Sequence, residues 1–194
     1  LDGSLSIWKK LVYNVQEFLK SIRSREMNIV FLDADSIGTD IDLSGFCQQG
    51  DVTRYGATTE DQMPFRVRTA DVIIVNKAEV NEKTAGAAQN LKLVCVTATG
   101  TNNIDKGFLQ RRGIAWRNVA GYSTENVAQH TFALLFALLE KLSYYDDYVK
   151  SGEYTASGMF THFGKAIHEP CGMTWGIIGF GSIGRRVADI AKAF

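Results

Sequence analysis

Residues 72–97 read VIIVNKAEVNEKTAGAAQNLKLVCVT, a stretch with the order strand, helix, strand. Its two ends, residues 72–75 and 93–97, are short apolar runs of the length of a buried strand. Between them, Asn81 is a typical N-cap for a helix that is predicted to continue through Ala88. Short apolar strands that alternate with helices indicate a parallel sheet with covering helices, and hence an α/β fold.

The same alternation continues on both sides of this stretch. Further strands are predicted at residues 28–33, 52–55 and 114–117, and further helices at residues 60–70 and 106–112. The pattern begins directly after Met27.

The composition is that of an ordinary globular protein. The chain has 194 residues, of which 45% are hydrophobic, and 21 Lys+Arg balance 21 Asp+Glu, so the formal net charge is zero. These values exclude a disordered or collagen-like chain, and no apolar run reaches the ~18 residues that span a bilayer. Zero net charge gives no electrostatic argument for nucleic acid or an anionic membrane. We therefore expect neither as a partner.

The three cysteines, Cys47, Cys95 and Cys171, are dispersed, with no C-x-x-C pair and no histidine at ligand spacing. An odd, dispersed set argues against a disulfide framework and against structural zinc. We predict no metal site, and the cysteine usage suits a reducing, cytoplasmic location.

Residues 1–26 differ from the rest of the chain. Apolar side chains recur there at helical spacing with lysines and arginines between them, which predicts an amphipathic, mildly basic helix. One interpretation is a helix that binds a membrane surface or a partner. The other is an extension upstream of the fold, because Met27, a natural start, stands at the edge of the first strand. We favour the extension.

A long helix is predicted to begin near Ser123, because Ser123 and Thr124 are N-cap types and Glu125 suits the positive end of the helix dipole. Its apolar residues occupy more than one face, so we expect it to be buried between domains or between subunits. The stripe comprises Val127, Thr131, Leu134, Leu135, Leu138 and Leu142, widened by Phe132, Phe136 and Leu139. Residues 151–172 are polar and contain glycines, which predicts an irregular connection.

The pattern G-F-G-S-I-G runs from Gly179 to Gly184, between an apolar run predicted to be a strand and an amphipathic helix that begins near Ser182. In this context Gly179 permits a tight turn, Gly181 lets a pyrophosphate approach the backbone, and Gly184 permits close packing of helix on strand. Free N–H groups of the first turn, at Ser182 and Ile183, then face the negative charge. The alternative is a purely structural tight turn. We favour dinucleotide binding at these five residues.

The sequence leaves the type of dinucleotide open. The acidic residue that would hold the ribose is expected about 20 residues after the first glycine. That position falls near or past Phe194, the last residue of the sequence. The predicted cofactor is therefore NAD or NADP, with NAD favoured.

From about Met27 to Phe194, the chain resembles the D-isomer-specific 2-hydroxyacid dehydrogenase family. Several motifs in the family's order carry the resemblance, at residues 72–77, 96–105, 112–114, 118–131 and 179–184. One departure is Gln129, where the family usually has Glu, at a helix position that we do not expect to carry chemistry.

The resemblance implies two α/β domains. A flavodoxin-like substrate domain would occupy residues 27–120, and residues 121–194 would begin a Rossmann NAD(P)-binding domain that is incomplete. Residues 1–26 would be the N-terminal extension. Family members are usually dimers through the region of the long helix, so the resemblance also implies a homodimer for the full-length protein.

The resemblance further implies that backbone N–H groups of two loops hold the carboxylate of the substrate. These loops map to Asn76, Lys77 and Ala78, and to Thr99 and Gly100. Loops at the carboxyl ends of parallel strands are also where exposed amides would meet an anion. From the residues alone, Asn76 is equally explained as a strand terminator and Gly100 as a plain turn.

No catalytic residue is assigned within the chain. In the family an Arg binds the substrate, a His is the general acid/base and a Glu tunes that His, and all three lie C-terminal to the glycine-rich turn. His130 is expected to be a packing or interface residue of the long helix, and His162 and His168 to be exposed. We therefore expect the 194-residue chain to be inactive by itself.

The predicted function is that of an NAD(P)-dependent oxidoreductase that interconverts a D-2-hydroxy acid and its 2-keto acid. Lys77 and its neighbours favour the glycerate dehydrogenase/hydroxypyruvate reductase branch over lactate. The alternative is a dinucleotide-sensing interaction protein, similar to the corepressors that share this fold.

Overall fold

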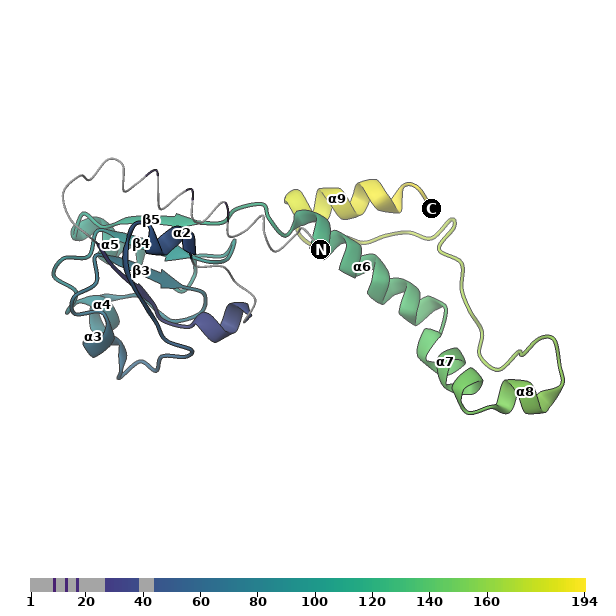
Figure 1. Ribbon diagram of the computed structural model, residues 1–194. Helices are drawn as coiled ribbons and strands as arrows, with labels where there is room; N and C mark the ends of the chain where they lie inside the picture. Colours follow the sequence, from purple (N-terminus) through teal and green to yellow (C-terminus); the bar gives the residue numbers. More distant parts are fainter. Residues whose placement is uncertain (1–8, 10–12, 14–16, 18–26, 39–43) are drawn as a thin grey trace. The chain divides into compact units, whose positions relative to one another are not determined.

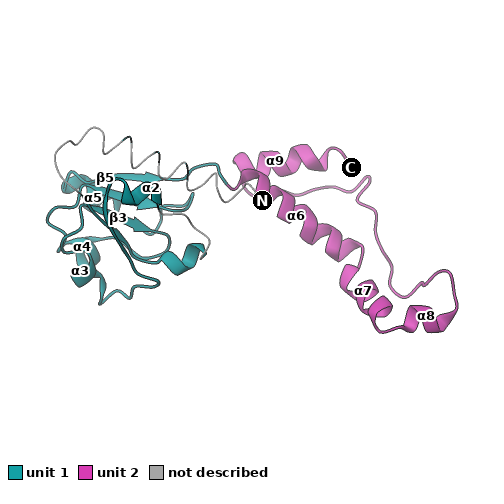
Figure 2. Ribbon diagram, viewed as in Figure 1, with its two compact units in different colours: residues 1–122 teal, residues 123–194 magenta. Residues whose placement is uncertain are grey.

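The computed structural model describes residues 27–38 and 44–194, together with Lys9, Tyr13 and Glu17. The predicted helix within residues 1–26 therefore lies outside the described residues, except for those three helical positions. The chain divides into two compact units, Leu1–Tyr122 and Ser123–Phe194, which Figure 2 distinguishes by colour. Each unit is described by itself.

Unit 1 contains a five-stranded, wholly parallel sheet with the order β2-β1-β3-β4-β5 (Figure 1). Its strands are β1 (Met27–Phe31), β2 (Gly50–Arg54), β3 (Val72–Val75), β4 (Leu93–Val96) and β5 (Ala115–Asn118). Its helices are η1 (Ala34–Ile37, a 3₁₀ helix), α2 (Ser44–Cys47), α3 (Met63–Arg66), α4 (Glu82–Ala85) and α5 (Lys106–Arg111). This strand order is that of flavodoxin-like folds, as the family resemblance implies.

Both faces of the central strands β3 and β4 are buried, and successive side chains of each strand pack on opposite faces of the sheet. Ile73 of β3 packs with the helices α3, α4 and α5, and its neighbour Ile74 packs with Phe46 of α2 on the other face. A strand covered on both faces is apolar at every position, which is why β3 reads VIIV and β4 reads LVCV.

The predicted strands of this unit are all present, but two helices are shorter than predicted. The helix expected at residues 60–70 is only α3, which has Pro64 in its first turn. The helix after Asn81 ends at Ala85. Asn81 is its N-cap, as predicted, because its side chain accepts hydrogen bonds from the backbone N–H groups of Lys83 and Thr84.

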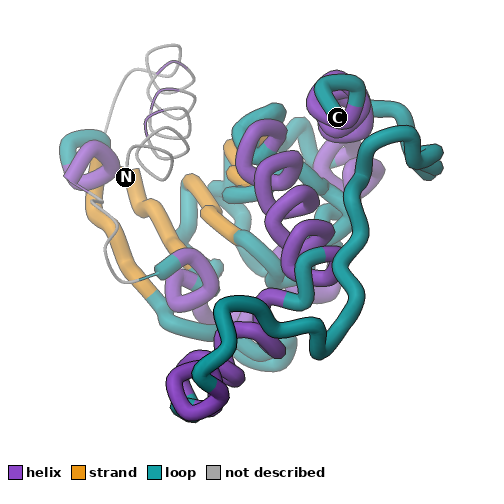
Figure 3. The backbone as a smooth tube through the Cα atoms, turned by 90° about the vertical axis from the view of Figure 1, so that its right-hand side faces the viewer, coloured by secondary structure: helices purple, strands orange, loops and turns teal. Residues whose placement is uncertain are grey.

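Unit 2 is mostly helical. It consists of α6 (Thr124–Leu139), α7 (Leu142–Lys150), α8 (Glu153–Ser157) and α9 (Ser182–Ala191). Lys141, in the left-handed region with φ +54°, separates α6 from α7. Between α8 and α9 the chain runs as a long loop, drawn in teal in Figure 3.

The strand predicted directly before the glycine-rich turn is absent, so this expectation is wrong for the described structure. Residues 175–178 form no ladder. A strand requires a hydrogen-bonded neighbour, and the part of unit 2 that the structure describes contains no other strand. Trp175 and Ile177 pack instead against Phe132 of α6 and Val187 of α9.

The apolar surface of α6 is only partly covered within its own unit. Phe132 lies under Trp175 and Phe194, with ring centroids 5.1 and 5.8 Å away. The predicted stripe is mostly on another side, where Leu134 and Leu138 are 55% and 70% exposed. Within unit 2, the apolar cluster takes in Phe132 and Phe136 of the widening residues and, from the stripe, Leu135. Among the described helices, none combines the length and apolarity needed to span a bilayer.

Candidate functional site

Two loops meet at the carboxyl ends of the neighbouring strands β3 and β4. Asn103 ties them together, because its side-chain Nδ2 donates to the carbonyl oxygen of Ala78 at 3.0 Å and lies 3.5 Å from that of Asn76. A backbone bridge between Val80 and Ile104 continues the connection. The two segments predicted to bind substrate are thus held side by side by bonds within unit 1.

A pocket of about 190 Å³ opens between these loops. Its lining is mainly polar and comprises Asn76, Lys77, Glu79, Ala98, Gly100, Asn102 and Asn103. Three of the five predicted substrate residues, Asn76, Lys77 and Gly100, therefore line one pocket.

The other two predicted substrate residues, Ala78 and Thr99, are not among the lining residues. The hydroxyl of Thr99 donates to the carbonyl oxygen of Val119 at 3.1 Å, and Asn118 Nδ2 donates to that of Thr99 at 2.7 Å. Thr99 thereby connects the loop to the end of β5, at the neighbouring strand.

The backbone N–H groups of the first loop already have an anionic acceptor, the carboxylate of Asp33. Its Oδ1 accepts from Asn76 at 2.8 Å, and its Oδ2 accepts from Lys77 at 2.6 Å and from Ala78 at 2.8 Å. Asp33 is buried, with 8% of its surface exposed. The three N–H groups of this loop that were assigned to substrate therefore bind a carboxylate of the chain itself.

Sequence reasoning missed Asp33, although a signal was present. Asp33 follows β1 within two residues, and β1 is the neighbour of β3 in the sheet. The carboxyl ends of parallel strands meet at one edge, so an acid in that position faces the loop after β3. Ser36 completes the connection, because its hydroxyl accepts from Nδ2 of Asn76 at 3.0 Å.

In the glycine-rich turn of unit 2, Gly179 and Gly184 occupy positions that a side chain would disturb. Gly179 has φ +95°, a conformation that L side chains rarely adopt. A Cβ on Gly184 would overlap the carbonyl oxygen of Gly179. A Cβ on Gly181 would meet no described atom within 4 Å, so this side of the turn is open toward the N-terminus of α9. No side chain caps that terminus, whose first residues are Ser182 and Ile183.

The three histidines lie in different surroundings. His130 is exposed on α6, and His168 is exposed in the loop. His162 is half-buried rather than exposed as predicted, because its ring stacks on Tyr148 at 3.7 Å and its Nε2 lies 2.8 Å from the hydroxyl of Tyr144. The packing of the His162 ring against two tyrosines accounts for its partial burial.

The described residues hold no group of three or more His, Cys, Asp or Glu side chains that would bind a metal ion. Burial raises the pKa of the Cys95 thiol to about 12, so Cys95 is not a nucleophile near neutral pH.

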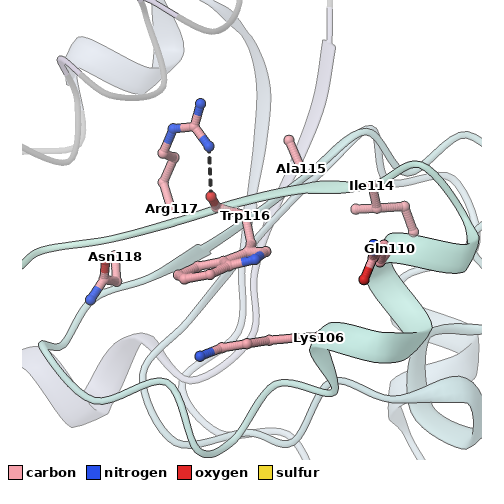
Figure 4. A pocket seen from close by; sticks show the side chains of 7 residues that line it. All are labelled: Lys106, Gln110, Ile114, Ala115, Trp116, Arg117 and Asn118. Carbon is pink, nitrogen blue, oxygen red and sulfur yellow. Dashed lines mark hydrogen bonds between the residues drawn. The ribbon is translucent and has the colours of Figure 1, made fainter.

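A larger hollow of about 580 Å³ lies beside the outer strand β5 (Figure 4). It is lined by Lys106, Gln110, Ile114, Ala115, Trp116, Arg117 and Asn118. The ammonium group of Lys106 lies 4.8 Å from the centre of the Trp116 ring, and Arg117 Nη1 donates to the carbonyl oxygen of Trp116 at 2.8 Å. None of the predicted site residues lines this hollow.

Comparison with known proteins gives a consistent set of matches. Residues 29–178 match the family model described as the catalytic domain of D-isomer specific 2-hydroxyacid dehydrogenases. The chain is 32% identical over 166 residues to a glycerate dehydrogenase of Methylorubrum extorquens, covering 85% of this chain and 52% of that protein. It spans about half the length of the curated relatives it matches.

Solved structures agree with the family match. One is the D-lactate dehydrogenase of Aquifex aeolicus complexed with NAD and lactic acid, with a TM-score of 0.69, 25% identity, and coverage of 86% of this chain and 48% of that one. Another is an acyclic imino acid reductase in complex with NADPH and D-Arg, with a TM-score of 0.68, 26% identity, and coverage of 86% and 53%.

Proposed function

Because the chain belongs to the D-isomer specific 2-hydroxyacid dehydrogenase family, we propose that it contributes the substrate-binding part of an oxidoreductase that interconverts a D-2-hydroxy acid and its 2-keto acid. The observation that carries this proposal is the polar pocket between the loops after β3 and β4. Ligands of open parallel sheets bind at the carboxyl ends of the strands, which is where this pocket lies.

We propose that substrate binding and NAD(P) binding are assigned to the two predicted domains. Residues 27–120 form the substrate domain, and residues 121–194 begin the NAD(P)-binding domain. The compact units, which divide between Tyr122 and Ser123, support this arrangement. We keep the cytoplasm as the proposed location, which the dispersed cysteines support, since Cys47, Cys95 and Cys171 are all free thiols.

The lining of the pocket supports a short, hydroxylated substrate. Three asparagines, a lysine and a glutamate offer hydrogen-bonding partners for hydroxyl groups, whereas only Ala98 is apolar besides Gly100. With the amides of Asn76, Lys77 and Ala78 bound to Asp33, the Lys77 ammonium and the Gly100 amide are the proposed partners of the substrate carboxylate. Glycerate and hydroxypyruvate fit this description.

The glycine-rich turn supports a nicotinamide dinucleotide as cofactor, which supplies or accepts the hydride when bound. The left-handed Gly179 and the close approach of Gly184 make the turn tight, and the open side of Gly181 leaves space for a pyrophosphate. The N–H groups of Ser182 and Ile183 begin an uncapped helix that would face its charge. We propose NAD or NADP, with NAD favoured as in the lactate dehydrogenase complex.

The cofactor proposal is tested with two glycine substitutions. Gly181→Ala places a methyl group where the pyrophosphate would come, and Gly176→Ala is the matched control, since a Cβ at either position meets no described atom within 4 Å. We expect NADH binding, measured by calorimetry, to weaken at least about tenfold in Gly181→Ala and to be unchanged in Gly176→Ala. Equal binding by both variants would contradict the assignment, as would the absence of NADH binding to the unsubstituted chain.

The substrate proposal is tested by titrating the chain with hydroxypyruvate and following backbone amides by NMR. We expect shifts at Lys77 and Gly100, and binding weakened about tenfold in Lys77→Met, because one ion pair to the carboxylate is lost. Lys83→Met, at an exposed lysine paired with Glu60 on the surface, is the control. Keto-acid binding also separates the enzyme from a dinucleotide sensor, and its absence would overturn the substrate proposal.

We also propose that the 194-residue polypeptide transfers no hydride by itself, because none of its residues matches the family's catalytic Arg, Glu or His. Steady oxidation of NADH in the presence of hydroxypyruvate or pyruvate would contradict this.

A homodimer through α6 is the proposed assembly of the full-length protein. Leu134 and Leu138 present an exposed apolar face on this helix. Analytical ultracentrifugation of Leu138→Glu against the unsubstituted protein tests it, with a shift to monomer as the expected result.

A further inference from the structure

We propose that Asp33 is a positioning residue of the candidate substrate site: its carboxylate fills the anion cradle of the 76–78 loop and so directs the substrate carboxylate outward, to Lys77 and Gly100. This inference rests on the proposed function. It goes beyond that function by assigning a role to Asp33, a residue that is not proposed to contact the substrate.

The first step is the geometry of the cradle. The N–H groups of Asn76, Lys77 and Ala78 are successive, and all three converge on one carboxylate at 2.6 to 3.0 Å. Successive N–H groups that point into one concavity form an anion-binding nest. Hydrogen bonds from N–H groups to a carboxylate are shorter and stronger than those between neutral groups. The loop is therefore built for an anion, and the chain supplies that anion itself.

The second step is the fixation of the loop from its other side. Asn103 donates to the carbonyl oxygens of Ala78 and Asn76, and Ser36 accepts from the side chain of Asn76. The N–H groups are thus held by Asp33 and the carbonyl groups by Asn103. With the backbone fixed in this way, the exposed side chain of Lys77 stands on the wall of the pocket.

The third step is electrostatic. Asp33 is buried, so its negative charge is screened little by water. A second carboxylate that approached the same N–H groups would meet a like charge with no free donor. The substrate carboxylate is therefore expected beyond the nest, within reach of the Lys77 ammonium and the Gly100 amide.

The test is chemical rescue. Asp33→Ala empties the nest, and we expect amide hydrogen exchange at residues 76–78 to become at least about tenfold faster, because three charge-assisted bonds are lost. Acetate in the buffer should then slow this exchange again and shift the three amide resonances, because it restores a carboxylate to the nest. In the unsubstituted chain acetate should leave these amides unchanged. Hydroxypyruvate, which we expect to shift Lys77 and Gly100 in the unsubstituted chain, should shift Asn76 and Ala78 in the variant.

Asp35→Ala is the matched control, since Asp35 lies two residues away with an exposed side chain that pairs with Arg54 at 3.8 Å. Exchange at residues 76–78 should be unaffected in this variant. Exchange at Ile73 and Val94, in the central strands, reports whether Asp33→Ala remains folded. If it does not, Asp33→Asn replaces it, because the amide keeps the shape of the side chain but loses the charge.

Two results would overturn the proposal: unchanged exchange at residues 76–78 in a folded Asp33 variant, or loosened exchange that acetate does not restore. These readouts do not depend on keto-acid binding. If hydroxypyruvate shifts no amide of the unsubstituted chain, the proposed function fails, whereas the exchange and acetate results still decide the role of Asp33 in the loop.

Discussion

At the scale of the single residue, Cys95 shows how burial sets chemistry. The side chain is fully buried on β4, in the cluster that contains Ile74 and Phe46. Burial raises the pKa of its thiol from 9.0 to about 12, and the nearby charge of Arg117 opposes this shift. The Cys95 thiol is therefore protonated at neutral and mildly alkaline pH, whereas Cys47 and Cys171 are exposed at the surface.

This difference predicts how the thiols react. At pH 8, Ellman's reagent should modify two thiols of the native chain rapidly, and the third only in guanidinium chloride. The reaction is followed by absorbance. Cys95→Ala, which lacks the slowly reacting thiol, is the control. Rapid reaction of all three thiols in the native chain would contradict the described burial.

The same shift predicts a loss of stability at high pH. The unfolded chain releases the Cys95 proton near pH 9, and the folded chain holds it until about pH 12. The Cys95 thiol therefore makes its full contribution to the free energy of unfolding below pH 9. Above pH 9 this contribution falls by about 1.4 kcal/mol per pH unit. Urea unfolding at pH 8.5 and 10.5 should show this slope in the unsubstituted chain, and Cys95→Ala should show a smaller one.

At the scale of the element, the start of α4 is fixed by a reciprocal cap. Asn81 Oδ1 accepts from the N–H of Lys83 at 2.9 Å and of Thr84 at 3.1 Å, and Thr84 Oγ1 accepts from the N–H of Asn81 at 2.9 Å. For a helix as short as Glu82–Ala85, these bonds satisfy a large share of the terminal donors.

Asn81→Ala should therefore lower the free energy of unfolding by about 1 kcal/mol. Asn90→Ala, at an exposed turn position, should change it by less than about 0.5 kcal/mol. Urea unfolding followed by circular dichroism measures both. Equal effects of the two substitutions would show that the cap contributes nothing specific.

The elements also show which features are readable from sequence. The strands β3 and β4 and the N-cap of α4 were predictable because buried strands and caps depend on local residue types. The missing strand at residues 175–178 was not, because a strand depends on a neighbour that an apolar run does not reveal. Asp33 was missed for a related reason, since its partners Asn76–Ala78 lie more than 40 residues away.

At the scale of the whole molecule, the two units differ in how much core they contain. The described residues of unit 1 form two buried clusters, one on each face of the sheet. Within unit 2, the buried cluster of described residues consists of Ala128, Phe132 and Val187, with partly buried neighbours. Since burial of apolar surface is the main favourable term in folding, unit 1 should be the more stable unit.

Limited proteolysis should reveal this difference. Chymotrypsin should cleave first at Phe160 or Phe163, which are 91% and 93% exposed in the loop after α8. Phe46 and Phe108, which are fully buried in unit 1, should resist cleavage. Mass spectrometry of the early products checks the order, and early cleavage within residues 44–122 would contradict it.

The outer strand β5 bears on whether copies of the molecule associate through the edges of their sheets. An outermost strand offers unpaired backbone groups on which further chains can polymerise. Here the Trp116 carbonyl oxygen is already bonded to Arg117, and the ammonium group of Lys106 lies over the Trp116 ring. A chain arriving as a sixth strand would find that acceptor occupied and would have to displace a guanidinium group. We therefore expect Arg117 to disfavour the addition of a further strand beside β5.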